Sequence, residues 1–249
     1  MNSQDYVDLT TSSGKLSERL VANAKSQSIN FSEWLYAKMP DFLESSRILD
    51  LGCGTGLQTN FFLSQINNVG GVVAVDASQE SLNSIPDDKK LTKFAADFNN
   101  FQEMGALLGR KKFDIINSTY AIYYCERPID FIEFMREYFL APEGKFVITG
   151  PTWVHELYSL IVGEFGENTE ITKTINFMES TLLPYVRSNY QTCDLHILNN
   201  TSVFGSIGEV SQFLGNTSYA ARIDSLELIK FLKSNKVLEF RKTSLMAIF

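Results

Sequence analysis

The sequence has few features that would tie the chain to a membrane or to a disulfide framework. No uncharged apolar run in its 249 residues approaches the length of a membrane-spanning helix. The first residues, Met1–Asp5, carry no basic segment that leads into an apolar one. The three cysteines are widely separated and odd in number, which favours neither a disulfide framework nor a CxxC metal site. We therefore expect a cytoplasmic protein with no membrane span and no bound metal.

Basic residues are also scarce. The chain has 22 Lys and Arg against 29 Asp and Glu, which gives a formal net charge of −7 and an isoelectric point near 5.0. Nucleic-acid binding normally requires a basic patch or stripe. The short clusters at Lys89–Lys90 and Arg110–Lys112 are typical of solvated surface, so no nucleic-acid partner is expected.

The most informative stretch is Ile48–Gly56, an apolar run that ends in glycines at alternate positions behind a carboxylate. Glycine adopts positive φ without strain and lets a ligand lie directly against the main chain. The next segment, Leu57–Ile66, has apolar residues near helical spacing, so the stretch predicts a strand, a glycine loop and a helix. The residues of the loop pattern are Asp50, Gly52, Cys53, Gly54 and Gly56.

The glycine spacing separates two nucleotide-binding interpretations. The dinucleotide fingerprint G-x-G-x-x-G would place its third glycine at position 57, which is Leu57. A nicotinamide oxidoreductase is therefore disfavoured. The Asp-x-Gly-x-Gly-x-Gly pattern from Asp50 to Gly56 instead resembles the first motif of the class I S-adenosylmethionine (SAM) dependent methyltransferases, and the resemblance extends to about residue 150. It implies SAM as the cofactor, with the glycine loop beneath its methionine and ribose parts.

Two acids follow later strands at places where this family contacts adenosine. Val72–Asp76 reads as a buried parallel strand, and Asp76 lies where a carboxylate would accept hydrogen bonds from a ribose diol, with Ala77 beside it. The next strand, Thr92–Ala96, ends in Asp97 and Phe98. The resemblance implies that Asp97 accepts from the adenine amino group while Phe98 covers the ring.

The remaining core segments complete an α/β pattern. Phe113–Thr119 reads as a fourth strand whose end, Ser118 and Thr119, should face the cofactor because ligands sit beyond the carboxyl ends of parallel strands. Pro142–Gly150 resembles the family's Pro-x-Gly turn and fifth strand. We predict a doubly wound, mostly parallel seven-stranded sheet, the Rossmann-like methyltransferase fold, with N-terminal helices and a helical insertion before the last strand.

This interpretation makes residues 1–249 one domain. Residues 1–45 form an N-terminal helical cap, 46–150 the SAM-binding core, and 151–249 the substrate side. The substrate side is predicted as helices over Trp153–Phe165 and Ile171–Leu183, the second stopped by Pro184. Two strands, Cys193–Phe204 and Val237–Phe249, enclose the helical insertion of residues 207–214 and 225–232.

Methyl transfer needs the donor and acceptor held in line, which can lower a barrier by about 7–11 kcal/mol, and a catalytic base is optional. His155 follows the fifth strand and is the candidate base, because histidine titrates near neutral pH. Tyr6 is a candidate for closing over SAM. Aromatic side chains that attract a sulfonium or line an acceptor pocket are predicted at the ends of strands four and five. They are Tyr120, Tyr123, Tyr124 and Trp153.

The sequence therefore predicts a SAM-dependent methyltransferase that acts on an oxygen or nitrogen of a small-molecule acceptor. Residues 117–120 lack the Asn/Asp-Pro-Pro-Tyr/Phe signature of amino-methylating nucleic-acid enzymes. A SAM-binding protein without catalysis, a sensor or a silent partner subunit, remains the alternative, because binding and transfer share the same loop. The acceptor, the methylated atom and the oligomeric state stay open at this point.

Overall fold

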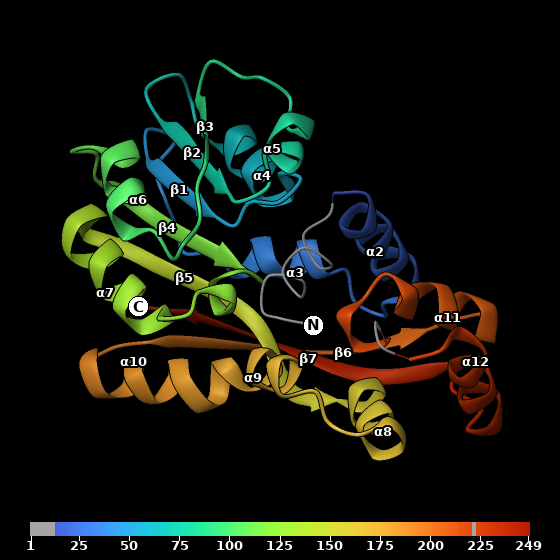
Figure 1. Ribbon diagram of the computed structural model, residues 1–249. Coiled ribbons are helices and arrows are strands. Elements are labelled where there is room, and N and C mark those ends of the chain that lie inside the picture. The colour runs from blue at the N-terminus through green and yellow to red at the C-terminus, as the bar shows by residue number, and fades with distance from the viewer. Residues whose placement is uncertain (1–12, 221–222) are drawn as a thin grey trace.

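A computed structural model of the chain describes residues 13–220 and 223–249, so Tyr6 lies outside the described residues. A seven-stranded sheet in the order β3-β2-β1-β4-β5-β7-β6 organises them (Figure 1). β1 to β5 pair in parallel, whereas β7 runs antiparallel to both β5 and β6. The predicted mostly parallel sheet is confirmed. The strands are β1 (Arg47–Leu51), β2 (Gly71–Asp76), β3 (Leu91–Ala95), β4 (Phe113–Thr119), β5 (Leu140–His155), β6 (Asp194–Val203) and β7 (Glu239–Ile248).

Helices cover both faces of this sheet (Figure 1). The expected N-terminal helices are α2 (Ser13–Ser26) and α3 (Phe31–Lys38), and the expected insertion is α11 (Ile207–Gly215) and α12 (Ser225–Ser234). The other helices are α4 (Leu57–Gln65), α5 (Gln79–Ser84), α6 (Phe101–Leu108), α7 (Pro128–Phe139), α8 (Glu156–Phe165), α9 (Thr169–Phe177) and α10 (Leu183–Asn189). None of the described helices is long and apolar enough to cross a membrane.

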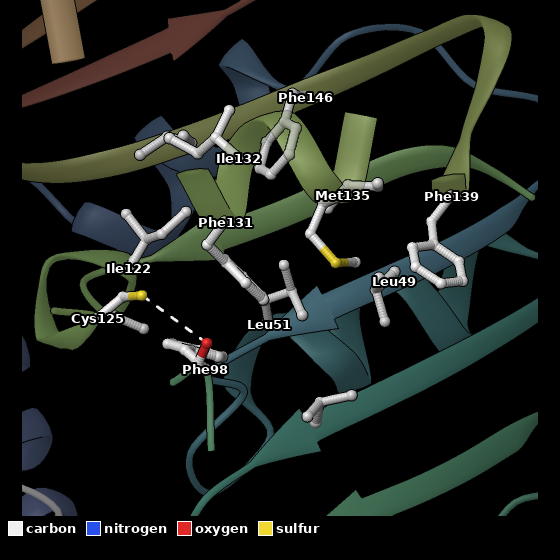
Figure 2. Packing of buried hydrophobic residues seen from close by; sticks show 14 of the residues in the cluster. Leu49, Leu51, Phe98, Ile122, Cys125, Phe131, Ile132, Met135, Phe139 and Phe146 are labelled. Atoms are coloured by element: carbon white, nitrogen blue, oxygen red, sulfur yellow. Dashed lines mark hydrogen bonds between the residues drawn. The ribbon is translucent and has the colours of Figure 1, made fainter. Parts of the chain in front are cut away.

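The central strands are buried on both faces, as their continuous apolar runs predict. On one face, which we call face A, Phe131 and Met135 of α7 pack with Leu49, Leu51 and Phe146 of the sheet (Figure 2). On the opposite face, face B, Leu35 of α3 and Phe62 of α4 pack against Ile48, Val147 and Met246. These two layers fix β1 and β4 as the rigid centre from which the site loops emerge.

A serine caps α5, as is common at helix N-termini. Ser78 Oγ accepts a hydrogen bond from the Ser81 N–H at 3.1 Å. This cap directs the chain away from the sheet immediately after Asp76. The acid therefore stays at the carboxyl end of β2.

Two boundaries of the substrate side were predicted wrongly. Trp153–His155 belongs to β5, and α8 begins only at Glu156, because β5 continues along β7 as far as the His155–Lys242 pair. Pro184 does not stop a helix. It lies in the first turn of α10 after a π-helical segment, Met178–Leu182, where the missing N–H of proline is tolerated.

Gly70, directly before β2, is packed tightly against the backbone that precedes β1. A Cβ at Gly70 would lie 2.7 Å from the Ser46 carbonyl oxygen and 2.8 Å from that of Glu44, whereas one at Gly163 in α8 would meet nothing within 4 Å. Gly70→Ala should lower the free energy of unfolding by about 1–3 kcal/mol. Gly163→Ala should leave it unchanged or raise it by about 0.5–1 kcal/mol. Urea denaturation measures both, and equal stabilities would contradict the packing described.

Candidate functional site

The glycine loop follows β1 at the point where the strand order reverses between β1 and β4. Gly52, Gly54 and Gly56 all adopt positive φ, at 68°, 52° and 85°. The Gly52 and Cys53 N–H groups donate to the Val75 carbonyl oxygen at 2.8 and 3.1 Å. The loop is thus tied to the end of β2, and Gly56 starts α4 in a left-handed conformation that most side chains disfavour.

Neighbouring groups approach the loop so closely that side chains do not fit there. A Cβ at Gly52 would lie 2.2 Å from the Cβ of Ala121 and 3.2 Å from the ring of Phe98. A Cβ at Gly54 would lie 3.0 Å from Leu16 of α2. The loop is therefore a side-chain-free cradle, covered from one side by the N-terminal helix α2.

Asp50 holds this loop from beneath. Its carboxylate is buried and accepts from Thr59 Oγ1 at 2.6 Å and from Asn117 Nδ2 at 2.8 Å. Burial raises the pKa of Asp50 to about 6, against the lowering effect of these two hydrogen bonds. With one donor on each oxygen, Asp50 ties the first turn of α4 and strand β4 to β1, which makes it a support of the loop.

Asp76 joins the loop from the end of β2. Its Oδ2 accepts from the Gly54 N–H and its Oδ1 from the Ser78 N–H, both at 2.8 Å. Burial raises the pKa of Asp76 above its usual range. Each carboxylate oxygen can accept a second hydrogen bond, so the acid fits a diol while it positions the loop. Ala77, which follows, is exposed beside it.

The predicted adenine contacts lie beyond β3. Asp97 is exposed, and its Oδ1 accepts from the Asn99 N–H at 2.9 Å. Phe98 is buried against Phe131, with ring centroids 5.3 Å apart, and its carbonyl oxygen faces the Cys125 thiol (Figure 2). The structure therefore brings Asp97 to the same end of the sheet as Asp76, with Phe98 between the glycine loop and the core.

The end of β4 supplies polar groups near the loop. Ser118 is fully buried, and its Oγ has no partner among the described residues. Thr119 donates to Asn117 Oδ1 at 3.3 Å. Both residues lie at the carboxyl end of β4, as predicted, and their contact with a cofactor stays a prediction.

The predicted aromatic pocket is divided by the sheet. Tyr120 has an uncommon φ of 56° and lies on face B. Its ring packs edge to face with Phe31 of α3, with centroids 5.6 Å apart, and its hydroxyl lies 2.6 Å from Ser244 Oγ. Tyr123 and Tyr124 lie on a 3-10 turn, with their ring centroids 4.8 Å apart. Tyr123 packs against Phe177 of α9 on the side of face A.

The fourth predicted pocket residue, Trp153, stands apart from these tyrosines. The residue is 70% exposed, and its backbone N–H donates to Glu179 Oε2 at 2.8 Å. Only Tyr120 of the four is placed on face B beside the end of β4. Burial raises the pKa of Tyr120 to about 12, so its hydroxyl stays protonated at neutral pH.

His155 is the N-cap of α8. Its Nδ1 accepts from the Tyr158 N–H at 3.2 Å, and its ring lies edge-on to Tyr219 at 4.8 Å. Burial and the nearby Lys242 lower the pKa of His155 to about 3. A neutral imidazole with Nδ1 already occupied favours a capping role over that of a base near pH 7.

Sequence reasoning missed the supports of the loop. Thr59 and Asn117 each donate a hydrogen bond to Asp50, while Leu16 and Ala121 cover the glycines. Thr59 stands on the first turn of the helix that follows the glycines, and Asn117 is aligned with Asp50 on the neighbouring strand. Asn117 directly follows the buried Ile115 and Ile116, which was an available signal, whereas Thr59 has polar neighbours on both sides and gave none. The contact with Leu16 bridges elements far apart along the chain and left no sequence pattern.

The strand order with antiparallel β7, the glycine loop at the switch point and acids beyond β2 and β3 define the class: a SAM-dependent methyltransferase of the Rossmann-like fold. Residues 43–218 match the family model described as a methyltransferase domain, and the chain belongs to that family. The methyl donor of this class is SAM. The buried supports, the cradle that a Cβ would fill and the two acids fit an adenosyl group by their chemistry.

Solved structures share this fold. The YcgJ protein from Bacillus subtilis aligns with a TM-score of 0.58 and 14% identity, over 87% of this chain and 96% of that one. A Bacillus halodurans protein solved as a candidate methyltransferase aligns with a TM-score of 0.56 and 12% identity, over 87% and 96%. An uncharacterized protein of Haemophilus influenzae is 32% identical over 88 residues. That match spans 34% of this chain and 34% of the relative, so the chain covers about a third of that relative's length.

The raised pKa of Asp50 gives a pH test of the loop support. Between about pH 4 and pH 6 the folded state holds the Asp50 proton more tightly than the unfolded state, so this group lowers the free energy of unfolding as pH rises through that window. Asp50→Asn removes the effect. Relative to the wild type, the variant should gain about 3 kcal/mol between pH 4 and pH 7.

Urea denaturation at both pH values measures this change. Asp130→Asn, at an exposed carboxylate on α7, is the matched control and should show no such gain. A constant difference in the free energy of unfolding between wild type and Asp50→Asn across the range would contradict the buried carboxylate with a raised pKa.

Proposed function

We propose that this protein transfers the methyl group of SAM to an oxygen or nitrogen of a small-molecule acceptor and releases S-adenosylhomocysteine. The observation that carries the proposal is the glycine loop, held by Asp50 and Asp76 at the switch point of a methyltransferase fold. Membership in the methyltransferase domain family supports it. SAM, when bound, supplies an electrophilic methyl group on a sulfonium.

The donor would lie along the carboxyl ends of β1, β2 and β3. In this proposal Gly52 and Gly54 present main chain to the methionine and ribose parts, and Asp76 accepts from the ribose hydroxyls through its remaining lone pairs. Asp97, which is exposed beyond β3, accepts from the adenine amino group. Ala77 and Phe98 border the ring on its two sides.

A small acceptor suits the cover over the loop. Leu16 of α2 lies against Gly54, and Phe31 of α3 lies against Tyr120, so α2 stands over the glycine loop and α3 over the end of β4. A net charge of −7 also disfavours a polyanionic acceptor. These features favour an enclosed acceptor of metabolite size over a nucleic acid.

The chain's contribution to the chemistry is orientation and exclusion of water. Neither His155, with its lowered pKa, nor Tyr120, with its raised pKa, is suited to remove a proton at neutral pH. An acceptor that is already nucleophilic needs no base. In-line alignment alone can supply about 7–11 kcal/mol.

The donor site is tested with S-adenosylhomocysteine by isothermal titration. Asp97→Ala removes the proposed adenine contact and only one local hydrogen bond, to the Asn99 N–H. It should weaken binding by about 1–3 kcal/mol, as for a lost hydrogen bond to a charged group. Asp41→Asn, an exposed acid ahead of β1, is the control and should bind like the wild type. Unchanged affinity in Asp97→Ala would remove Asp97 from the site, and no binding by the wild type would refute the proposed function.

A turnover assay distinguishes a methyltransferase from a protein that binds SAM without catalysis. The wild type with radiolabelled SAM should transfer label to members of a panel of phenols, amines and carboxylic acids. Protein that binds S-adenosylhomocysteine but transfers label to no acceptor would favour the alternative, a non-catalytic SAM-binding protein.

A further inference from the structure

Lys242 lies on face B of β7, beside the acceptor side of the proposed site. Lys242 pairs with His155 of the neighbouring strand β5. Ser244, two residues further along β7, is hydrogen-bonded to the Tyr120 hydroxyl. α2 lies along this end of the sheet near α11 (Figure 1), and its Asn23 accepts from Lys242 Nζ at 2.5 Å. The Lys242 ammonium is therefore enclosed between β7, α2 and α11.

The part of the chain that the structure describes offers this ammonium no acidic partner. Its contacts are the neutral Asn23 amide oxygen and the ring of Phe213 on α11, 5.6 Å from Nζ. Among residues 13–220 and 223–249 no carboxylate forms an ion pair with it. The charged group on the facing side of α2 is Arg19, which adds positive charge.

Nearby carboxylates are engaged elsewhere. Glu18 accepts from the Asn216 amide at 2.9 Å, Glu156 pairs with Arg241 at 2.6 Å, and Glu209 accepts from the Gly205 N–H at 3.1 Å. None of the three is directed to Lys242. No carboxylate of the described residues therefore compensates the positive charge of Lys242, although the chain as a whole is acidic.

A partly buried charge without a counter-ion is costly, and proteins normally pair such groups. Burial and Arg19 lower the pKa of Lys242 to about 7, and Lys242 in turn helps to lower the pKa of His155. The cluster thus has the electrostatics of a site completed by an anion from outside the described chain.

The distance between Lys242 and the glycine loop can be spanned by one small molecule. On α2, Leu16 contacts Gly54 and Asn23 contacts Lys242. These two positions are seven residues apart on one helical face, about 10 Å along the axis. Thr149, on the same face of β5, is buried with no partner for its Oγ1 among the described residues, which leaves a polar group between the two ends.

We propose that Lys242, with Asn23 and Arg19, binds an oxyanion of the acceptor substrate, a carboxylate or phosphate that lies at the far end of the molecule from the methylated atom. This assignment rests on the proposed function and narrows its substrate class to anionic metabolites. Lys242 is a binding residue in this account and takes no part in the transfer step.

The test uses the full chain saturated with S-adenosylhomocysteine, at constant ionic strength. Benzoate and inorganic phosphate are titrated, with benzamide as the neutral match, and the thermal unfolding midpoint is followed. Benzoate or phosphate should raise the midpoint of the wild type saturably, whereas benzamide should not. In Lys242→Met the apparent Kd should weaken about tenfold to a hundredfold, as for a lost hydrogen bond to a charged group.

Three further variants separate the site from general charge effects. Lys242→Arg should retain anion binding, and Lys25→Met, which removes an exposed charge from α2, should behave as the wild type. Asn23→Asp places a carboxylate against the ammonium. It should raise the midpoint and abolish the anion response even if Lys242→Met folds poorly.

The result that would overturn the proposal is a wild type that does not respond to the anions, or one whose response is unchanged in Lys242→Met and in Asn23→Asp. S-adenosylhomocysteine binding, measured separately on the same proteins, distinguishes a failure of the Lys242 site from a failure of the proposed function. Its presence without an anion response refutes only the Lys242 site, and its absence refutes the proposed function itself.

Discussion

The structure depends on how two buried carboxylates hold a stretch of main chain that has no side chains. Asp50 and Asp76 accept hydrogen bonds from the first turn of α4, from β4, from the glycine loop and from the start of α5. Burial raises the pKa of both acids. Burying the two carboxylates is unfavourable, but their hydrogen bonds fix the loop at the switch point. The positive-φ backbone of the three glycines is thereby kept in one conformation.

The electrostatics of the two ends of the proposed site differ in sign. The donor end is acidic, with Asp76 and Asp97 near the place proposed for the cationic sulfonium and the adenosine. The other end, along α2 and β7, is basic, with Lys242 and Arg19. A cationic donor and an anionic acceptor suit this arrangement, and α2 connects the two ends through Leu16 and Asn23.

Much of the fold was predictable because its signals are local. The glycine pattern, the apolar strands and the Ser78 cap each depend on neighbouring residues, and all are present in the structure. Pro184 was misjudged because proline is compatible with a first turn, and a π-helical segment created one inside a continuous helical pattern. Trp153 was placed on a helix because the sequence does not show that β5 continues along β7 as far as His155.

The candidate site was predictable to the extent that its residues follow strand ends. Sequence placed Asp76 and Asp97 at one edge of the sheet, where the structure has them. The division of the tyrosines between two faces, the capping role of His155 and the enclosure of Lys242 depend on contacts between distant segments. Such contacts are set by tertiary packing, and a residue type at a position does not reveal them.

The central claim is that the cradle and the two downstream acids grip an adenosyl group. A crystal structure of the complex with S-adenosylhomocysteine tests it most directly. The account predicts ribose hydroxyls within hydrogen-bonding distance of Asp76, the adenine amino group at Asp97, and the thioether over Gly52 and Gly54. A ligand bound elsewhere, or one in the crevice that touches neither acid, would contradict it.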